Sequence, residues 1–157
     1  MPWPVNDEVP TVCGIAGFLT YGSFTGEGEL AKRAERMADN LVHRGPDDAG
    51  VWTDATAGVA LAHRRLSILD LSSAGHQPMI SSSGRRVLVF NGEIYNHLEL
   101  RHELEGAGLA PAWNGHSDTE TLLAGLDAWG TEGTLKKTIG MFALAVWDRV
   151  DRTLTLA

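Results

Sequence analysis

The order in which helical and β-prone segments follow one another limits the folds open to this chain more than any other feature. A helical pattern over residues 27–42 precedes a central group of β-prone segments. Two further helical patterns lie between this group and the last β-prone segments of the chain. Strands that cluster in the middle of a chain, with helices on both sides in sequence, are typical of α+β layers. The sequence therefore predicts an α+β fold rather than regular strand–helix alternation.

Short apolar runs between Gly- and Ser-rich stretches predict the strands. Their ranges are 14–20, 51–53, 58–66, 87–90, 141–147 and 153–157. Residues 141–147 are all apolar, which predicts a buried strand, and a polar turn then leads into a returning strand.

Three segments carry helical signals. Over 27–42 apolar residues recur at helical spacing, which predicts an amphipathic helix that Gly45 and Pro46 end. Its expected buried residues are Leu30, Ala34, Met37, Ala38 and Leu41. Asn96 is placed to cap a helix that ends at Gly106 or Gly108, while Ser117 and Glu120 form a capping-box pattern before a third helix.

Charge and hydropathy exclude two classes of partner. The net charge is −7 and the pI is near 5.3, whereas nucleic-acid binding requires clustered Lys and Arg. No run approaches the about 20 apolar residues of a membrane span, and residues 1–12 lack the basic and apolar parts of a secretory signal. We therefore expect a cytoplasmic protein that binds neither nucleic acid nor a membrane.

Cys13 is the single cysteine. It can form no intrachain disulfide and excludes a thiolate-rich zinc site, while the six histidines show no metal-ligand spacing, so no metal site is expected. A single cysteine is most often a small packing residue, and otherwise a nucleophile. Its position directly before an apolar strand places it at the mouth of that strand.

Six motifs in a fixed order bear on this choice. They are Cys13-Gly-Ile-Ala-Gly-Phe, His43-Arg-Gly-Pro-Asp-Asp, His63-Arg-Arg-Leu-Ser-Ile-Leu-Asp, Gly75-His-Gln-Pro-Met, Phe90-Asn-Gly-Glu-Ile-Tyr-Asn-His and Ser117-Asp-Thr-Glu. Over nearly all of residues 13–157 the chain closely resembles class II glutamine amidotransferase domains. Arg65 is followed by Leu66, Ser67 and Ile68, which resembles the asparagine synthetase branch, since related branches typically carry a tryptophan after this arginine.

The resemblance implies both a fold and a reaction. The fold is the four-layer αββα sandwich of N-terminal-nucleophile hydrolases, and the reaction is hydrolysis of L-glutamine to glutamate and ammonia. Cys13 matches the nucleophile, whose own α-amino group, with an ordinary pKa of about 7.7–8.0, carries the proton when cysteine is the first residue. Asn91, through its side-chain amide, and Gly92, through its N–H, match the oxyanion hole.

Four further residues match glutamine-binding positions: Arg65, Ile68, Glu93 and Asp118. By resemblance, Arg65 binds the substrate carboxylate, for which a bidentate guanidinium is the best side chain, and Glu93 and Asp118 receive the α-ammonium. Each has an ordinary alternative. Arg65 alone is typical of a solvated strand charge, Asp118 of an acidic first helical turn, and Asn91-Gly92 of a type I′ hairpin turn.

The resemblance also implies a longer enzyme. Residues 13–157 are then a glutaminase domain lacking its last strands, and the synthetase domain, which uses ATP and Mg²⁺, is absent, since no S-G-G-x-D-S-type loop occurs. We expect no cofactor in this segment. The expected partners are L-glutamine and the synthetase domain, with homodimer formation left open.

Residues 1–12 depart from the family pattern, because they convert the Cys13 amine into an amide. They are interpreted as a pro-segment or an over-long start, and otherwise as a genuine extension that leaves the domain inactive. The alternative function is accordingly a catalytically inactive structural or binding domain of a related ATP-dependent amide-forming synthetase.

Overall fold

A computed structural model describes residues 13–20, 27–66 and 75–157. Within these residues it contains three helices and seven strands. In chain order they are β1 (Gly14–Leu19), α1 (Glu27–Asp39), β2 (Asp48–Asp54), β3 (Val59–Arg65), β4 (Met79–Ile80), β5 (Arg86–Ile94), α2 (His97–Gly106), α3 (Asp118–Lys137), β6 (Gly140–Asp148) and β7 (Thr153–Leu156).

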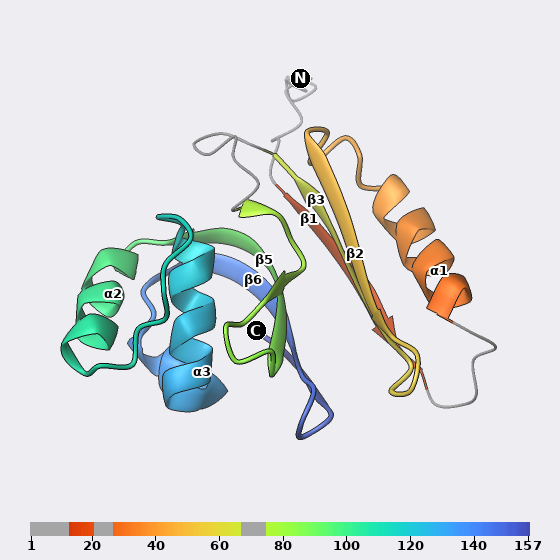
Figure 1. Cartoon of the computed structure of the whole chain (residues 1–157). Helices are drawn as coiled ribbons and strands as arrows, with labels where there is room; N and C mark the ends of the chain where they lie inside the picture. Colours follow the sequence, from red (N-terminus) through yellow and green to blue (C-terminus); the bar gives the residue numbers. More distant parts are fainter. Residues whose placement is uncertain (1–12, 21–26, 67–74) are drawn as a thin grey trace, which may run out of the picture.

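The strands form two antiparallel sheets. One has the order β1-β3-β2 and the other β4-β5-β6-β7. Figure 1 shows the sheets face to face, with α1 outside the first sheet and α2 and α3 outside the second. The predicted four-layer αββα arrangement is confirmed.

The alternation of side chains along each strand explains the layers. On β3, Val59 and Leu61 pack in the core between the sheets, whereas Ala60 and Ala62 pack under α1. β5 divides in the same way. Val87 and Val89 lie between the sheets, and Leu88, Phe90 and Ile94 pack with leucines of α2 and α3.

The first helix is shorter than predicted, because α1 ends at Asp39 and residues 41–44 continue as turns. Leu30, Ala34 and Ala38 are buried against the sheet, but Met37 is 40% exposed. These three buried residues are spaced four apart and form a narrow stripe of mostly small side chains. The prediction that Met37 belongs to the core is therefore wrong, since it lies at the margin of this stripe.

The hairpin-turn interpretation of Asn91-Gly92 is also wrong. β5 passes through both residues and pairs with β6 from Arg86 to Ile94, and the chain turns only at Tyr95 and Asn96. Asn96 is the N-cap of α2 as predicted, but its side chain makes no capping bond. It instead donates to Lys137 O at 2.9 Å and accepts from Ile139 N at 2.8 Å, which ties the start of α2 to the α3–β6 connection.

The third helix begins as the sequence predicts, with Ser117 Oγ accepting from Glu120 N at 3.2 Å. The Glu120 carboxylate does not complete the box. It accepts from the N–H groups of Asn114 at 2.7 Å and Gly115 at 3.0 Å, and it lies 3.4 Å from Arg101. Glu120 thus shapes the loop that enters α3.

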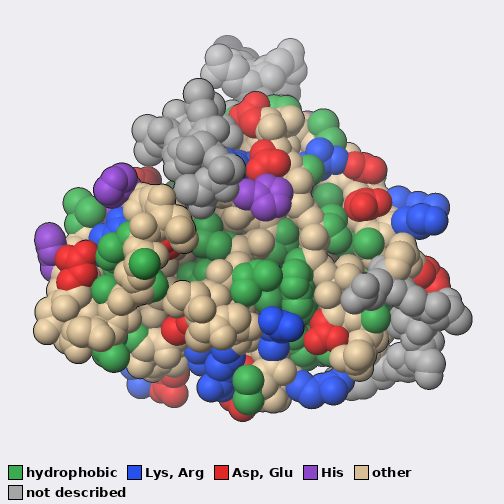
Figure 2. Space-filling model, viewed as in Figure 1, with side chains coloured by type: hydrophobic (Ala, Val, Ile, Leu, Met, Phe, Trp, Pro, Cys, Tyr) green, Lys and Arg blue, Asp and Glu red, His purple; other side chains and the backbone are tan. Residues whose placement is uncertain are grey.

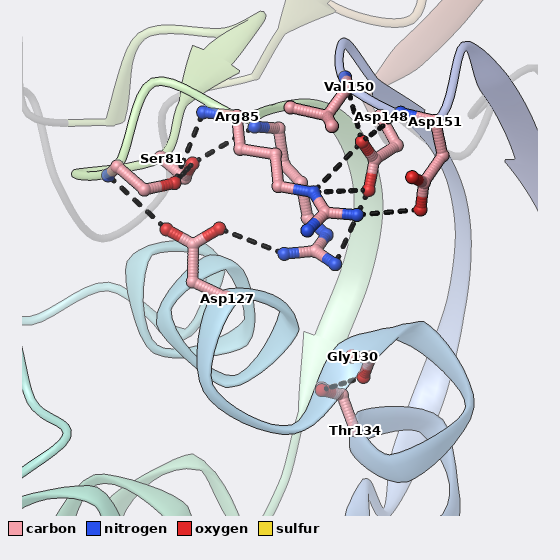
Figure 3. Close-up of polar contacts among 10 residues, drawn as sticks. Ser81, Arg85, Asp127, Gly130, Thr134, Asp148, Val150 and Asp151 are labelled. Atoms are coloured by element: carbon pink, nitrogen blue, oxygen red, sulfur yellow. Dashed lines mark hydrogen bonds and ion pairs between the residues drawn. The ribbon is translucent and has the colours of Figure 1, made fainter.

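A cluster of arginines and aspartates fastens the start of β5 (Figure 3). The buried guanidinium of Arg86 lies 3.1 Å from Asp127 of α3 and 3.4 Å from Asp148 of β6, and Arg85 contacts Asp148 at 2.8 Å. Burial opposes ionisation of Asp148, but hydrogen bonds from backbone N–H groups and Arg85 outweigh it and lower its pKa. This end of β5 is therefore bound to both α3 and β6.

On the face seen in Figure 2, hydrophobic side chains gather in the middle, and charged side chains of both signs are scattered around them. None of the helices in the described part of the chain is long and apolar enough to cross a membrane.

Candidate active site

Strand alternation places the predicted nucleophile on the inner side of its sheet. Ile15 of β1 packs against the core between the sheets, so Cys13, two residues earlier, lies on the same side. Gly14 pairs with Arg64, which puts Cys13 opposite Arg65, the last residue of β3. Because side chains alternate along a strand, Arg65 lies on the same inner face of the sheet as Leu61 and His63. The first sheet thus brings Cys13 and Arg65 together.

The second sheet brings Asn91 and Glu93 to the facing side. Val87 and Val89 point toward the first sheet, and Asn91 and Glu93 continue their alternation along β5. Figure 1 shows the start of β1 and the curved end of β5 at the same end of the molecule. Glu93 is exposed and Asn91 is partly buried, so this end of the sandwich is open to solvent.

The thiol of Cys13 is held at the end of β3. The N–H of Leu66 points at Cys13 Sγ at 3.4 Å, and Arg44 Nε donates to the carbonyl of Cys13 at 3.4 Å. Both contacts come from segments that flank the Arg65 strand end. The first contact directs the half-buried thiol, and the second holds the backbone of Cys13.

The guanidinium of Arg65 lies over Gly75. A Cβ on residue 75 would be 2.2 Å from Arg65 Nη2, so a larger residue there would displace this guanidinium. Gly75 belongs to the motif that includes His76 and Gln77, so this motif lies against the Arg65 side chain.

Gly92 packs closely against the neighbouring strand β6, and its backbone N–H points away from that strand. Its φ is +144°, and a Cβ there would lie 2.3 Å from Met141 O and 2.5 Å from the Cα of Phe142. Successive N–H groups of a strand point to opposite edges. The N–H of Ile94 donates to Asp118, away from β6, so the N–H of Gly92 lies on that same edge. Outside the β5–β6 ladder, it has no acceptor among the described residues.

Asp118 is placed differently from the other predicted residues. It is the first residue of α3, on the helical side of the second sheet, and its carboxylate accepts from Ile94 N at 2.9 Å and Thr119 N at 2.8 Å. It therefore joins α3 to the end of β5 beside Glu93. Ile68 lies outside the described residues.

Sequence reasoning missed the role of His63. It is 1% exposed, and its Nε2 lies 3.1 Å from the carbonyl oxygen of Phe90, to which it must donate. Burial lowers the pKa of His63 to about 4. A signal was present in the sequence, because His63 continues the inward alternation of Val59 and Leu61. It thus links the two sheets as a neutral ring.

We expect His63 to make the protein sensitive to acid. The unfolded chain, with a histidine pKa of 6.5, binds a proton more readily than the folded chain with a pKa of about 4. Stability is therefore full above pH 6.5 and falls as the pH drops toward 4, by about 3 kcal/mol between pH 7 and pH 4. Urea unfolding at several pH values measures this loss.

His63→Gln is the control, because glutamine cannot titrate in this range. Its free energy of unfolding should change less than that of the wild type between pH 6.5 and 4. Asp48, Asp54 and Asp148 have pKa values below 3.8, since hydrogen bonds outweigh burial. Their protonation therefore lowers the free energy of unfolding at lower pH than the protonation of His63 does. Equal slopes for both proteins would contradict the prediction.

Two hollows lie away from these residues. One of about 520 Å³ lies against the second half of α3 and Thr155 of β7. Another of about 570 Å³ lies between β4 and α3, with Asn114 and Glu120 in its lining. Neither includes Cys13, Arg65 or Asn91 in its lining.

Comparisons with known proteins identify the family of the chain. The family model described as "Glutamine amidotransferase domain" matches residues 12–157. The chain is 39% identical to asparagine synthetase B (glutamine-hydrolysing) of Escherichia coli, over 87% of the chain and 23% of that protein. It is 37% identical to glutamine-hydrolysing asparagine synthetase 1 of Bacillus subtilis, over 91% of the chain and 22% of that protein.

A Mycobacterium tuberculosis protein, provisionally named glutamine-hydrolysing asparagine synthetase, is 44% identical over 93% of the chain and 24% of its own length. The chain thus spans about a quarter of the length of these relatives. A solved structure of glutamine phosphoribosylpyrophosphate amidotransferase from B. subtilis has a TM-score of 0.64, with 20% identity, over 88% of this chain and 35% of that one. That likeness supports the fold. With a family model that covers almost the whole sequence, the chain belongs to the glutamine amidotransferase domain family.

Proposed function

We propose that this chain hydrolyses the side-chain amide of L-glutamine to glutamate and ammonia, with Cys13 as nucleophile. The observation that carries the proposal is the inward alternation of two facing sheets. It directs Cys13 and Arg65 from one sheet, and Asn91 and Glu93 from the other, to the same open end of the sandwich.

In the proposed reaction Cys13 Sγ attacks the amide carbon of glutamine, and the carbonyl electron pair moves to oxygen. The free α-amino group of Cys13 takes the thiol proton and passes it to the nitrogen, so that the C–N bond breaks and ammonia leaves. Water then hydrolyses the γ-glutamyl thioester, which restores the thiol and releases glutamate. The Asn91 side-chain amide and the outward N–H of Gly92 donate to the oxyanion in both steps.

The remaining residues suit a zwitterionic substrate. Arg65 offers a guanidinium to the α-carboxylate of glutamine, and Glu93 and Asp118 offer carboxylates to its α-ammonium. Glu93 is exposed beside Gly92, while Asp118 uses two of its lone pairs on backbone N–H groups and retains others. We propose Ile68 as a further glutamine contact on the strength of its motif.

The destination of the ammonia concerns the whole protein. Relatives four times as long are named asparagine synthetases. We propose that a second domain consumes the ammonia in ATP- and Mg²⁺-dependent synthesis of asparagine, in the cytoplasm. Detection of asparagine formed from aspartate, ATP and glutamine by the natural-length protein tests this part, and formation of another amide instead would overturn it.

Replacement of Asn91 by alanine should reduce kcat by roughly 10²–10³-fold, with a smaller effect on KM. An oxyanion donor acts mainly in the transition state, which is why the loss is expected in kcat. Steady-state release of glutamate by protein that begins at Cys13 measures both constants.

Arg65→Ala is the matched comparison. Its contact with the carboxylate is made in both the ground state and the transition state, so the variant should mainly raise KM. An Asn91→Ala enzyme with normal kcat and raised KM would remove Asn91 from the oxyanion hole.

A further inference from the structure

Phe90, the residue before Asn91, has both of its backbone groups bonded to side chains. Its N–H donates to Gln77 Oε1 at 2.6 Å, and its carbonyl accepts from His63 Nε2 at 3.1 Å. Phe90 is 3% exposed, Gln77 6% and His63 1%. These three residues, which we name the Phe90 clamp, are thus a buried polar arrangement with complementary donors and acceptors.

The Phe90 clamp lies along the edge of β5, just beyond the point where β4 stops pairing with it. β4 pairs with β5 only at Val87 and Leu88, so the next pair of edge groups, those of Phe90, would have no strand partner. A buried backbone group without a partner is strongly disfavoured. Gln77 and His63 therefore replace the missing strand at a single residue and then leave the edge open.

The open position that follows is Gly92. Along this edge, Phe90 N–H is taken by Gln77 and Ile94 N–H by Asp118 at 2.9 Å. Of these three edge donors, only that of Gly92 has no acceptor outside the ladder within the described residues. A donor that is left vacant between two bonded neighbours is oriented in advance, which is what stabilisation of a developing oxyanion requires.

We propose that His63 and Gln77 are positioning residues for the oxyanion site: by fixing both backbone groups of Phe90, they set the directions of the Asn91 side chain and the Gly92 N–H. This inference rests on the proposed glutamine hydrolysis. Neither residue touches the substrate. They act through the strand, because Gln77 holds the peptide plane before the Phe90 Cα and His63 the plane after it, and a change in either is carried into Asn91 and Gly92.

The kinetic test uses the natural-length protein with a free Cys13 amine. His63→Ala and Gln77→Met each remove one side of the clamp and should lower kcat by about 10–100-fold, with KM within about twofold, since small misplacement of a donor is costly. His63→Gln, whose amide places an N–H near the position of Nε2, should restore most of kcat. His102→Gln on α2, an exposed histidine, should leave both constants unchanged. Unaltered kcat in folded His63→Ala and Gln77→Met would overturn the proposal.

A second measurement separates positioning from packing. The aldehyde analogue of glutamine forms a tetrahedral adduct with the thiol, and its affinity should fall in step with kcat, while the affinity for glutamate stays the same. Equal losses for the aldehyde and for glutamate would overturn the positioning role. If His63→Ala does not fold, Gln77→Met tests the clamp through the peptide plane on the other side of the Phe90 Cα.

A third measurement does not depend on catalysis. The amide ¹H–¹⁵N resonance of Gly92 should shift or broaden in His63→Ala and Gln77→Met, but not in His102→Gln. A Gly92 resonance that stays in place in both clamp variants would overturn the clamp. A wild type that shows no glutaminase activity while the Gly92 resonance responds as expected would instead overturn the proposed function and leave the clamp supported.

Discussion

Protein with alanine in place of Cys13 should lose glutamine hydrolysis by about 10⁴-fold or more, the scale on which loss of a catalytic nucleophile acts. The sequence contains no second thiol that could replace it. The residue lies at the strand end, and its sulfur is contacted by the N–H of Leu66, so alanine removes the reacting atom and preserves the backbone. Glutamate release and labelling by a glutamine-analogue electrophile measure the loss.

Cys13→Ser is the companion variant, since it keeps the shape of the side chain and its hydrogen-bonding capacity but offers a weaker nucleophile. It should bind glutamine and hydrolyse it poorly, and the electrophile should not label it at residue 13. Turnover in Cys13→Ala comparable to that of the wild type would remove Cys13 from the mechanism.

The second large effect concerns the amine of Cys13. In the form that retains residues 1–12, this nitrogen is a peptide amide, which is not basic, and it cannot take the thiol proton. In the form that begins at Cys13, the amine has an ordinary pKa of about 7.7–8.0 and can exchange a proton near neutral pH. We expect the longer form to have little or no glutaminase activity and the shorter form to be active.

Intact-mass analysis of protein from the native gene, together with turnover of the two forms, measures this effect. We predict a start at Cys13, reached by cleavage after Val12 or by initiation at Val12 followed by methionine removal. Residues 1–12 still attached to a fully active enzyme would refute both the processing and the role of the α-amine. Inactivity of both forms would favour the alternative of a structural or binding domain.

The layered fold follows from patterns that are local in sequence. The alternation of Val59 to Ala62 and the all-apolar run 141–147, which forms β6, are visible without a structure, and their segments occur where expected. The prediction that residues 141–147 form a buried strand is wrong for the start of β6 and confirmed for its second half. Met141 is apolar and yet 75% exposed, and such exposure depends on how the layers pack, which a local apolar run does not specify.

The site was predictable only where a motif carries it. Asn91-Gly92 has the local composition of a turn, and only pairing with β6 keeps it extended. His63 and Gln77 act on Phe90, which is 27 and 13 residues further along the chain, so no pattern of spacing connects them. Asn96 occupies its predicted cap position, but its side chain binds residues beyond α3.

The strand that carries Asn91 and Gly92 is tied to one helix at two points. Asp127 of α3 holds Arg86 at the beginning of β5, and Asp118 of α3 holds Ile94 at its end. These carboxylates are separated by about 14 Å of helix, whereas the strand between the two attachments has a contour length of about 26 Å. The long side chain of Arg86 spans part of this difference, and Figure 1 shows that β5 is curved between the two attachments. β5 is therefore an arc that α3 holds at both ends, so that a rotation or translation of the helix changes the bend of the strand near its Ile94 end, where the Gly92 donor lies.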